Sequence, residues 1–149
     1  MGKEKNEIRV KAGKKSKRKG GAGERWVVKR LKELGIIARR TAQFNGKSKD
    51  SESDVVIENC DLHIEVKNEK NVTDSSLLKY IKQVYQDAPH KTWVICFNSG
   101  NGQWKVLEQL SGYFPERSYD NYEIRTFGVG RYGIFRFAEY WNTWKEFNI

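Results

Sequence analysis

The sequence has few cysteines, few prolines and no long hydrophobic run. Its 149 residues include two prolines and two cysteines, Cys60 and Cys96. These cysteines lie far apart inside apolar runs and have no adjacent histidines, which excludes a disulfide scaffold and disfavours a structural zinc site. We therefore expect two free thiols in a reducing cytosol.

Long apolar segments are also missing. No run of about 18 or more apolar residues occurs, so the sequence predicts no membrane-spanning helix. No apolar segment follows the basic N-terminus, which disfavours a secretory signal peptide. The length fits one domain, or one domain with a tail. With 38% apolar and 32% charged residues, we expect a modest core beneath a highly charged surface.

Positive charge is concentrated at the N-terminus. The chain has a formal net charge of +9, and residues 1–19 hold nine basic and two acidic residues, hence +7. Since this segment has almost nothing to bury, we predict a disordered basic arm at 1–19 and a single domain at 20–149. The arm suits a polyanion, because each neutralised phosphate releases counterions. The expected DNA-backbone contacts are Lys11, Lys14, Lys15, Lys17, Arg18 and Lys19. A solubility tail is the alternative.

The rest of the chain alternates between helical and strand patterns. Periodicity predicts helices at 22–34, 74–87 and 137–147. Apolar or alternating runs predict strands at 36–41, 54–58, 62–68, 92–98 and 122–127. A strand or a helix fits 104–110, and the polar stretch 43–53 predicts a loop. The second and third strands can form a hairpin, and the fourth follows a helix, which favours a parallel crossover. We therefore predict an α/β fold with a mixed central sheet flanked by helices.

The residues that suggest chemistry are acidic. Glu65 and Lys67 are two positions apart on one strand, so their side chains point to the same face, and Asp54 can lie near Glu65 across the hairpin. Two carboxylates brought together repel each other, and a divalent cation relieves the repulsion. Mg²⁺ prefers such oxygen ligands, and Lys67 can stabilise charge on a phosphate in the transition state. A solvated strand face is the alternative.

Glu24 is a second unusual acid. It lies three and four positions before Val27 and Val28, on or near the inward stripe of the first helix. A carboxylate there costs stability unless it has a partner. Two interpretations stay open: a first-turn acid favoured by the helix dipole, or a metal ligand that faces the sheet.

Two segments carry a family resemblance. Ser53-Asp54-Val55-Val56-Ile57 and Leu62-His63-Ile64-Glu65-Val66-Lys67-Asn68 resemble the PD-(D/E)XK nuclease superfamily. The helix start Gly20-Gly21-Ala22-Gly23-Glu24-Arg25, with Arg39-Arg40 ending the first strand, is similar to archaeal-type and viral Holliday-junction resolvases. The likeness covers roughly residues 20–98. It departs at Ser53, where the motif usually has proline.

The resemblance implies a restriction-endonuclease-like core and a set of site residues. Glu24, Asp54, Glu65 and the main-chain carbonyl of Val66 would be metal ligands, and Lys67 the catalytic lysine. It also implies a Mg²⁺-dependent endodeoxyribonuclease, with Mn²⁺ as a substitute, acting in DNA recombination and repair. Such an enzyme would resolve four-way DNA junctions by attack of a metal-activated water on a phosphodiester.

The same resemblance implies a homodimer that binds branched or duplex DNA. We expect no membrane partner, and a location in the cytoplasm of a prokaryotic cell or a virus-infected host. Arg39 and Arg40 join the expected DNA contacts. The alternatives are another nuclease of the superfamily, of repair, restriction or exonuclease type, and a non-catalytic basic nucleic-acid-binding protein.

Some polar and aromatic residues are weaker candidates. Gln83 resembles a polar residue that some relatives aim at the active site, and Ser48 or Ser51 would be the substrate-loop serine. His63 shares the face of Glu65, where an exposed strand histidine is the favoured interpretation and a residue that supports the metal ligands is the alternative. For the aromatic residues near the C-terminus, core or dimer packing is favoured over base stacking.

Overall fold

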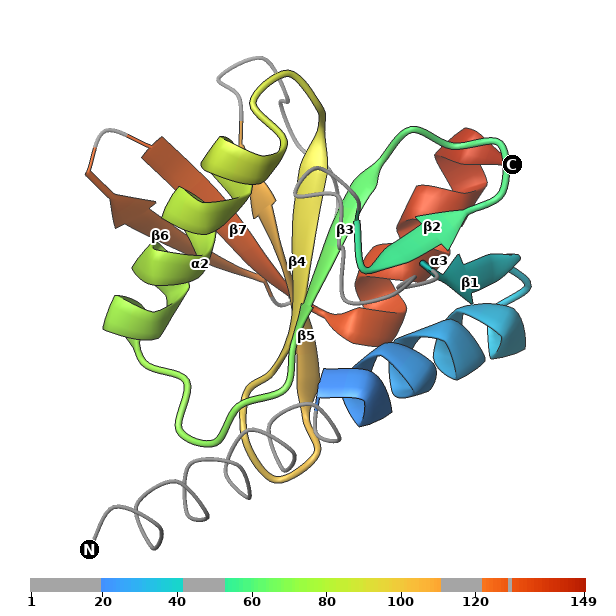
Figure 1. The fold of residues 1–149 in the computed structure, drawn as a ribbon, viewed down its shortest axis with the longest axis horizontal. Helices are drawn as coiled ribbons and strands as arrows, with labels where there is room; N and C mark the ends of the chain where they lie inside the picture. The colour runs from blue at the N-terminus through green and yellow to red at the C-terminus, as the bar shows by residue number, and fades with distance from the viewer. Residues whose placement is uncertain (1–19, 42–52, 111–121, 129) are drawn as a thin grey trace, which may run out of the picture.

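The computed structural model describes residues 20–41, 53–110, 122–128 and 130–149 (Figure 1). The predicted basic arm, Ser48 and Ser51 lie outside the described residues. A helix at 20–33 comes first and is called the N-terminal helix here. The elements after it are β1 (Ala38–Arg40), β2 (Val55–Ile57), β3 (His63–Lys67), α2 (Asp74–Asp87), β4 (Trp93–Asn98), β5 (Trp104–Gln109), β6 (Glu123–Phe127), β7 (Gly130–Arg136) and α3 (Phe137–Asn148).

The described strands form one seven-stranded mixed sheet in the order β1-β2-β3-β4-β5-β7-β6. β3 and β4 are parallel, with α2 between them in the chain, and all other neighbouring strands are antiparallel. β2 and β3 form the predicted hairpin, and Val55 pairs with Ile64. The mixed α/β sheet predicted from the sequence is therefore confirmed.

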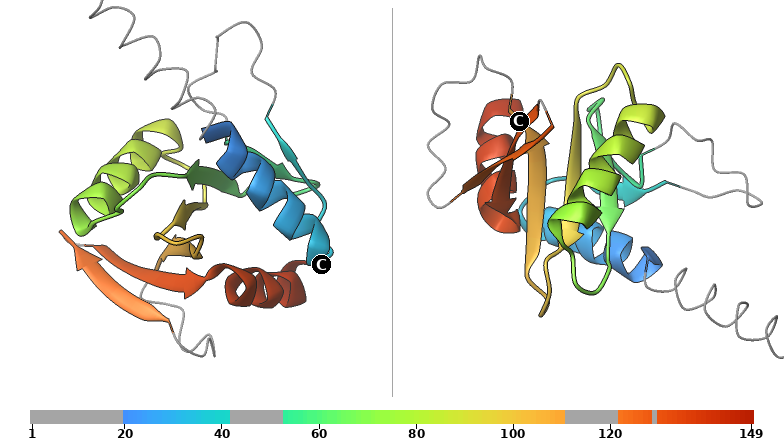
Figure 2. Two further views of the ribbon diagram at one scale, coloured as in Figure 1. Left: turned by 90° about the horizontal axis from the view of Figure 1, so that it is seen from below. Right: turned by 90° about the vertical axis from the view of Figure 1, so that its left-hand side faces the viewer.

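Helices cover both faces of this sheet. On β4, Val94 and Cys96 belong to the core cluster of the N-terminal helix and α3, whereas Ile95 and Phe97 belong to the cluster under α2. Alternate residues of a strand point to opposite faces, so α2 covers one face and the other two helices cover the opposite one. Figure 2 shows α2 and α3 on opposite sides of the central strands.

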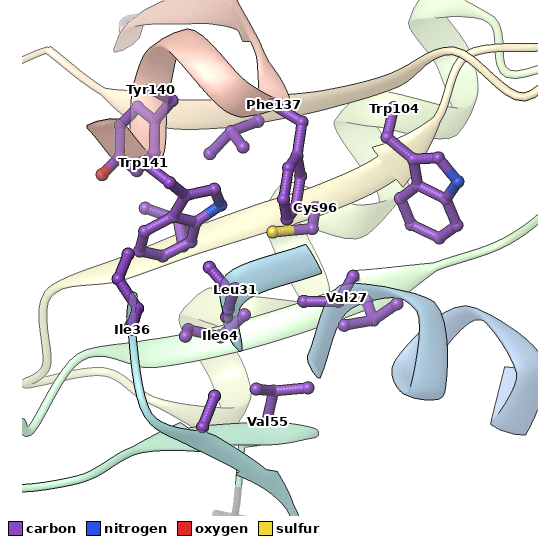
Figure 3. Packing of buried hydrophobic residues seen from close by; sticks show 14 of the residues in the cluster. Val27, Leu31, Ile36, Val55, Ile64, Cys96, Trp104, Phe137, Tyr140 and Trp141 are labelled. Carbon is purple, nitrogen blue, oxygen red and sulfur yellow. The ribbon is translucent and has the colours of Figure 1, made fainter. Parts of the chain in front are cut away.

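The aromatic residues near the C-terminus complete the first of these cores. Phe137, Tyr140 and Trp141 of α3 are buried and pack over the sheet with Val27 and Leu31 of the N-terminal helix (Figure 3). The prediction of core packing is confirmed for these aromatic residues. Phe147, by contrast, is 79% exposed.

One strand was not predicted from the sequence. β7 contains Gly130 and Gly133, and glycine weakens a strand because it has no side chain to pack. Each glycine leaves room for an aromatic ring two residues later. A Cβ on Gly130 would lie 2.5 Å from the Tyr132 hydroxyl, and one on Gly133 would lie 2.7 Å from the Phe135 ring. β5, which the sequence left open, is a strand, and β1 is shorter than predicted.

Three smaller features are the cap of α2, the two cysteines and the lengths of the helices. Thr73 caps α2 in a capping box with Ser76. Cys60 and Cys96 are free thiols. None of the helices in the described chain combines the length and apolarity that a membrane span needs.

Candidate metal centre and active site

The β2–β3 hairpin brings Asp54 and Glu65 together. Val55 and Ile64 pair across the hairpin and are both buried under the N-terminal helix and α3. Glu65, the chain neighbour of Ile64 in β3, therefore points to the opposite face of the sheet, which α2 covers. Asp54 directly precedes β2, and its side chain hydrogen-bonds with that of Glu65. The Val66 N–H donates to Asp54 Oδ2 at 2.8 Å, and this bond holds the aspartate side chain across the hairpin.

The protonation of Asp54 reflects this crowding. The pKa of Asp54 is raised to about 8, chiefly by burial and then by the neighbouring Glu65 carboxylate, which acts through repulsion and through a hydrogen bond between the two side chains. The charge of Glu24 acts in the same direction, and the Val66 N–H opposes the rise. The two carboxyl groups therefore favour holding a proton between them over being ionised together.

His63 is a second buried polar residue on β3, beside Glu65. Its Nε2 lies 2.7 Å from Glu65 Oε1, and the two residues are only 1% and 7% exposed. The expectation of an exposed strand histidine is therefore wrong. This face of β3 is covered, and Trp93, the partner of His63 on β4, is buried as well.

Glu24 lies close to the pair but has a cationic partner of its own. Its Oε2 accepts bonds from Arg40 Nη2 at 2.8 Å and Nε at 3.1 Å. The Glu24 side chain is 16% exposed, and its charge acts on Asp54. The structure thus places Glu24 in an ion pair with Arg40 of β1, near enough to Asp54 for its charge to act on that residue.

Gly23 allows the N-terminal helix to approach the end of β3 closely. A Cβ at this position would lie 2.8 Å from Asn68 Cβ and 3.2 Å from the Trp104 ring. The absence of a side chain therefore sets the distance between this helix, which carries Glu24, and β3, which carries Glu65.

We expect Gly23→Ala to lower the free energy of unfolding by about 1–3 kcal/mol, because the helix must move away from β3 to relieve the overlap. Urea denaturation measures this change. Gly20→Ala in the same helix is the matched control, because a Cβ there meets nothing within 4 Å. The control should keep the stability or raise it by as much as ~1 kcal/mol through helix propensity. Equal stabilities for the two variants would contradict the close approach.

Lys67 points from β3 toward α2. Its Nζ donates to Gln83 Oε1 at 2.9 Å and lies 5.3 Å from the centre of the Tyr80 ring. Gln83 is exposed on α2. The hairpin and α2 thus bring together a lysine and a glutamine that the resemblance singled out separately.

The basic residues of β1 lie near this region. Arg39 is exposed, and Arg40 binds Glu24. A Cβ on Gly21 would lie 3.3 Å from the guanidinium groups of both Arg25 and Arg40. Gly21 therefore leaves space in which two guanidinium groups meet beside Glu24. The sequence patterns singled out Arg40 but did not indicate its partner.

The carboxylates suit a cation that needs few protein ligands. Across the described ranges, no group of three or more His, Cys, Asp or Glu side chains is arranged to hold a metal ion. Asp54 and Glu65 form a pair whose charges repel, with Glu24 next to it. Mg²⁺ fits such a pair, because it retains several waters and often uses one or two carboxylates plus substrate phosphates. The Val66 carbonyl as a ligand stays a prediction.

Known proteins offer limited similarity. Comparison with protein-family models and with characterised protein sequences finds no match. Among solved structures, the chain is similar to a Holliday junction resolvase, Hjc, from the archaeal hyperthermophile Archaeoglobus fulgidus, at 18% identity and a TM-score of 0.44. The alignment covers 82% of this chain and 99% of that one. A likeness at this identity and score carries no conclusion about function.

Proposed function

We propose that this chain is a divalent-metal-dependent DNA endonuclease whose preferred substrate is branched DNA, above all four-way junctions. The observation that carries the proposal is the contact between half-buried Asp54 and buried Glu65 on the β2–β3 hairpin, with Lys67 following Glu65 on the same face of β3. Two carboxylates in mutual repulsion favour a cation, and a lysine on the same face can act on a phosphate.

Each residue has a distinct role in this proposal. Asp54 and Glu65 would hold the cation, and Glu24 adds negative charge beside them. When bound, Mg²⁺ would acidify a water and neutralise charge on the scissile phosphate. The ammonium of Lys67 stabilises charge that develops on the phosphate in the transition state, and its bond to Gln83 limits the orientations of Nζ.

DNA is supported as the substrate by charge. Residues 1–19 hold +7 of the net +9, and backbone phosphates are the groups that such a segment binds without reading sequence. Arg39 adds an exposed cation on β1. The preference for four-way junctions, and a homodimer with two active sites for paired cuts, rest on the sequence resemblance to the resolvases.

Cleavage of matched substrates tests the proposal. A four-way junction, a flap and a linear duplex of the same sequence are incubated with the full chain, with and without Mg²⁺. We expect the junction alone to be cut efficiently, and only with Mg²⁺. Equal cutting of the linear duplex would indicate another nuclease of the superfamily. Junction binding without cleavage in Mg²⁺ or Mn²⁺ would indicate a non-catalytic nucleic-acid-binding protein.

A further inference from the structure

His63 and Glu65 form a buried, directly bonded pair. His63 Nε2 and Glu65 Oε1 are 2.7 Å apart, and the residues are 1% and 7% exposed. An ionised carboxylate has no hydrogen to donate, so the hydrogen of this bond lies on His63 Nε2 when Glu65 is ionised. A buried carboxylate without a donor is costly, and the histidine supplies that donor.

The main chain of His63 is held in the sheet. Its backbone N–H donates to the Thr92 carbonyl at 2.9 Å, and His63 pairs with Trp93 of β4. His63 and Glu65 are two residues apart on β3, so their side chains share a face. The other ring nitrogen, Nδ1, is buried and has no hydrogen-bond partner in the described part of the chain. The hydrogen bonding that the structure gives this ring is therefore directed at Glu65.

The second polar neighbour of Glu65 is Asp54. Asp54 shares a hydrogen bond with Glu65 across the hairpin in the metal-free protein, and once both groups are ionised, as binding of a cation requires, the two carboxylates repel each other. A glutamate has three side-chain torsions and can rotate away from such a neighbour. The bond from His63 opposes this rotation by binding Oε1, so the repelling carboxylates stay together.

We propose that His63 is a positioning residue, which holds the Glu65 carboxylate against the repulsion of Asp54 and so preorganises the divalent-cation site. This inference rests on the proposed function, in which Asp54 and Glu65 bind that cation. Residues that orient metal ligands in this way contribute about 10–100-fold to metal affinity or activity. His63 itself contacts neither the cation nor the substrate in this proposal.

The experiment compares His63→Gln with His63→Met in the full chain. Glutamine retains a donor that can reach Glu65, and methionine has a similar length without one. Isothermal titration with Mn²⁺ gives the metal affinity of each protein, and thermal unfolding in EDTA gives its metal-free stability. His63→Asn, whose shorter amide does not reach as far, replaces the methionine variant if that protein fails to fold.

We expect His63→Met to bind Mn²⁺ about 10–100-fold more weakly than wild type, and His63→Gln to recover most of the affinity. Equal Mn²⁺ affinity in wild type and His63→Met, even with a lowered unfolding temperature, would show that His63 only stabilises the fold and would overturn the inference alone. Equal losses in the Gln and Met variants would overturn it as well, because the donor would not matter. A wild type that binds no Mn²⁺ would overturn both the inference and the proposed function.

Discussion

Replacing Glu65 with glutamine is expected to lower the rate of Mg²⁺-dependent junction cleavage by about 10³-fold or more, the upper range for losing one group that stabilises a transition state. Glutamine keeps the size of the side chain and can still bond to His63, but it removes the negative charge that the cation needs. Single-turnover cleavage with excess protein measures the rate, and a mobility shift without metal measures junction binding. Binding should stay within a few-fold of wild type.

Lys67→Ala is expected to lower the cleavage rate by about 10²–10³-fold, because it removes the ammonium group that acts on the phosphate. Junction binding should again be retained. Glu58→Gln and Lys70→Ala are the matched controls, since both residues are exposed, Glu58 next to β2 and Lys70 beyond β3. Wild-type cleavage by the Glu65 and Lys67 variants would place the activity at another site or in a contaminating enzyme.

The second large effect concerns stability and pH. The pKa of Asp54 is raised from 3.8 to about 8 in the folded protein, chiefly by burial and then by Glu65. At a pH between these two pKa values, Asp54 is protonated in the folded state, whereas it has released this proton in the unfolded state. The free energy of unfolding of the metal-free protein should therefore fall as the pH rises from about 4 to about 8. The lost stability is on the order of a few kcal/mol.

Asp54→Asn should remove most of this loss. Asparagine is neutral at every pH, its oxygen can accept from the Val66 N–H, and its NH₂ can donate to Glu65. In EDTA, the variant should be close to wild type near pH 4 and clearly more stable near pH 9. Urea denaturation across this range measures the difference between the two proteins. Asp61→Asn, an exposed acid in the same hairpin, is the control, and a constant difference between Asp54→Asn and wild type would refute the raised pKa.

Local patterns predicted much of the fold. The alternation at 62–68, the helical stripe at 74–87 and the apolar run at 92–98 led to the hairpin, α2 and the parallel β3–β4 pair. Each of these signals comes from residues close in sequence. β7 was missed because its two glycines matter only once the rings of Tyr132 and Phe135 lie over them.

The candidate site was predictable only in part. Strand spacing and the hairpin placed Asp54 and Glu65 together, because register follows from a short turn. The burial of His63 depends on residues from a later part of the chain, among them its partner Trp93 on β4. The ion pair between Glu24 and Arg40 joins residues 16 positions apart on two elements, and no local pattern indicates it. Long-range packing therefore decides which polar residues surround the two acids.

The most direct test of the account is a Mn²⁺ titration of the metal-free chain by calorimetry at pH 8.5, with Mg²⁺ as competitor. If Asp54 and Glu65 share one cation, wild type should bind one Mn²⁺ ion per chain, Mg²⁺ should displace it, and Asp61→Asn should behave as wild type. Asp54→Asn and Glu65→Gln should each lose this binding. A wild type that binds no divalent cation, or an Asp54→Asn variant with unchanged affinity, would contradict the account.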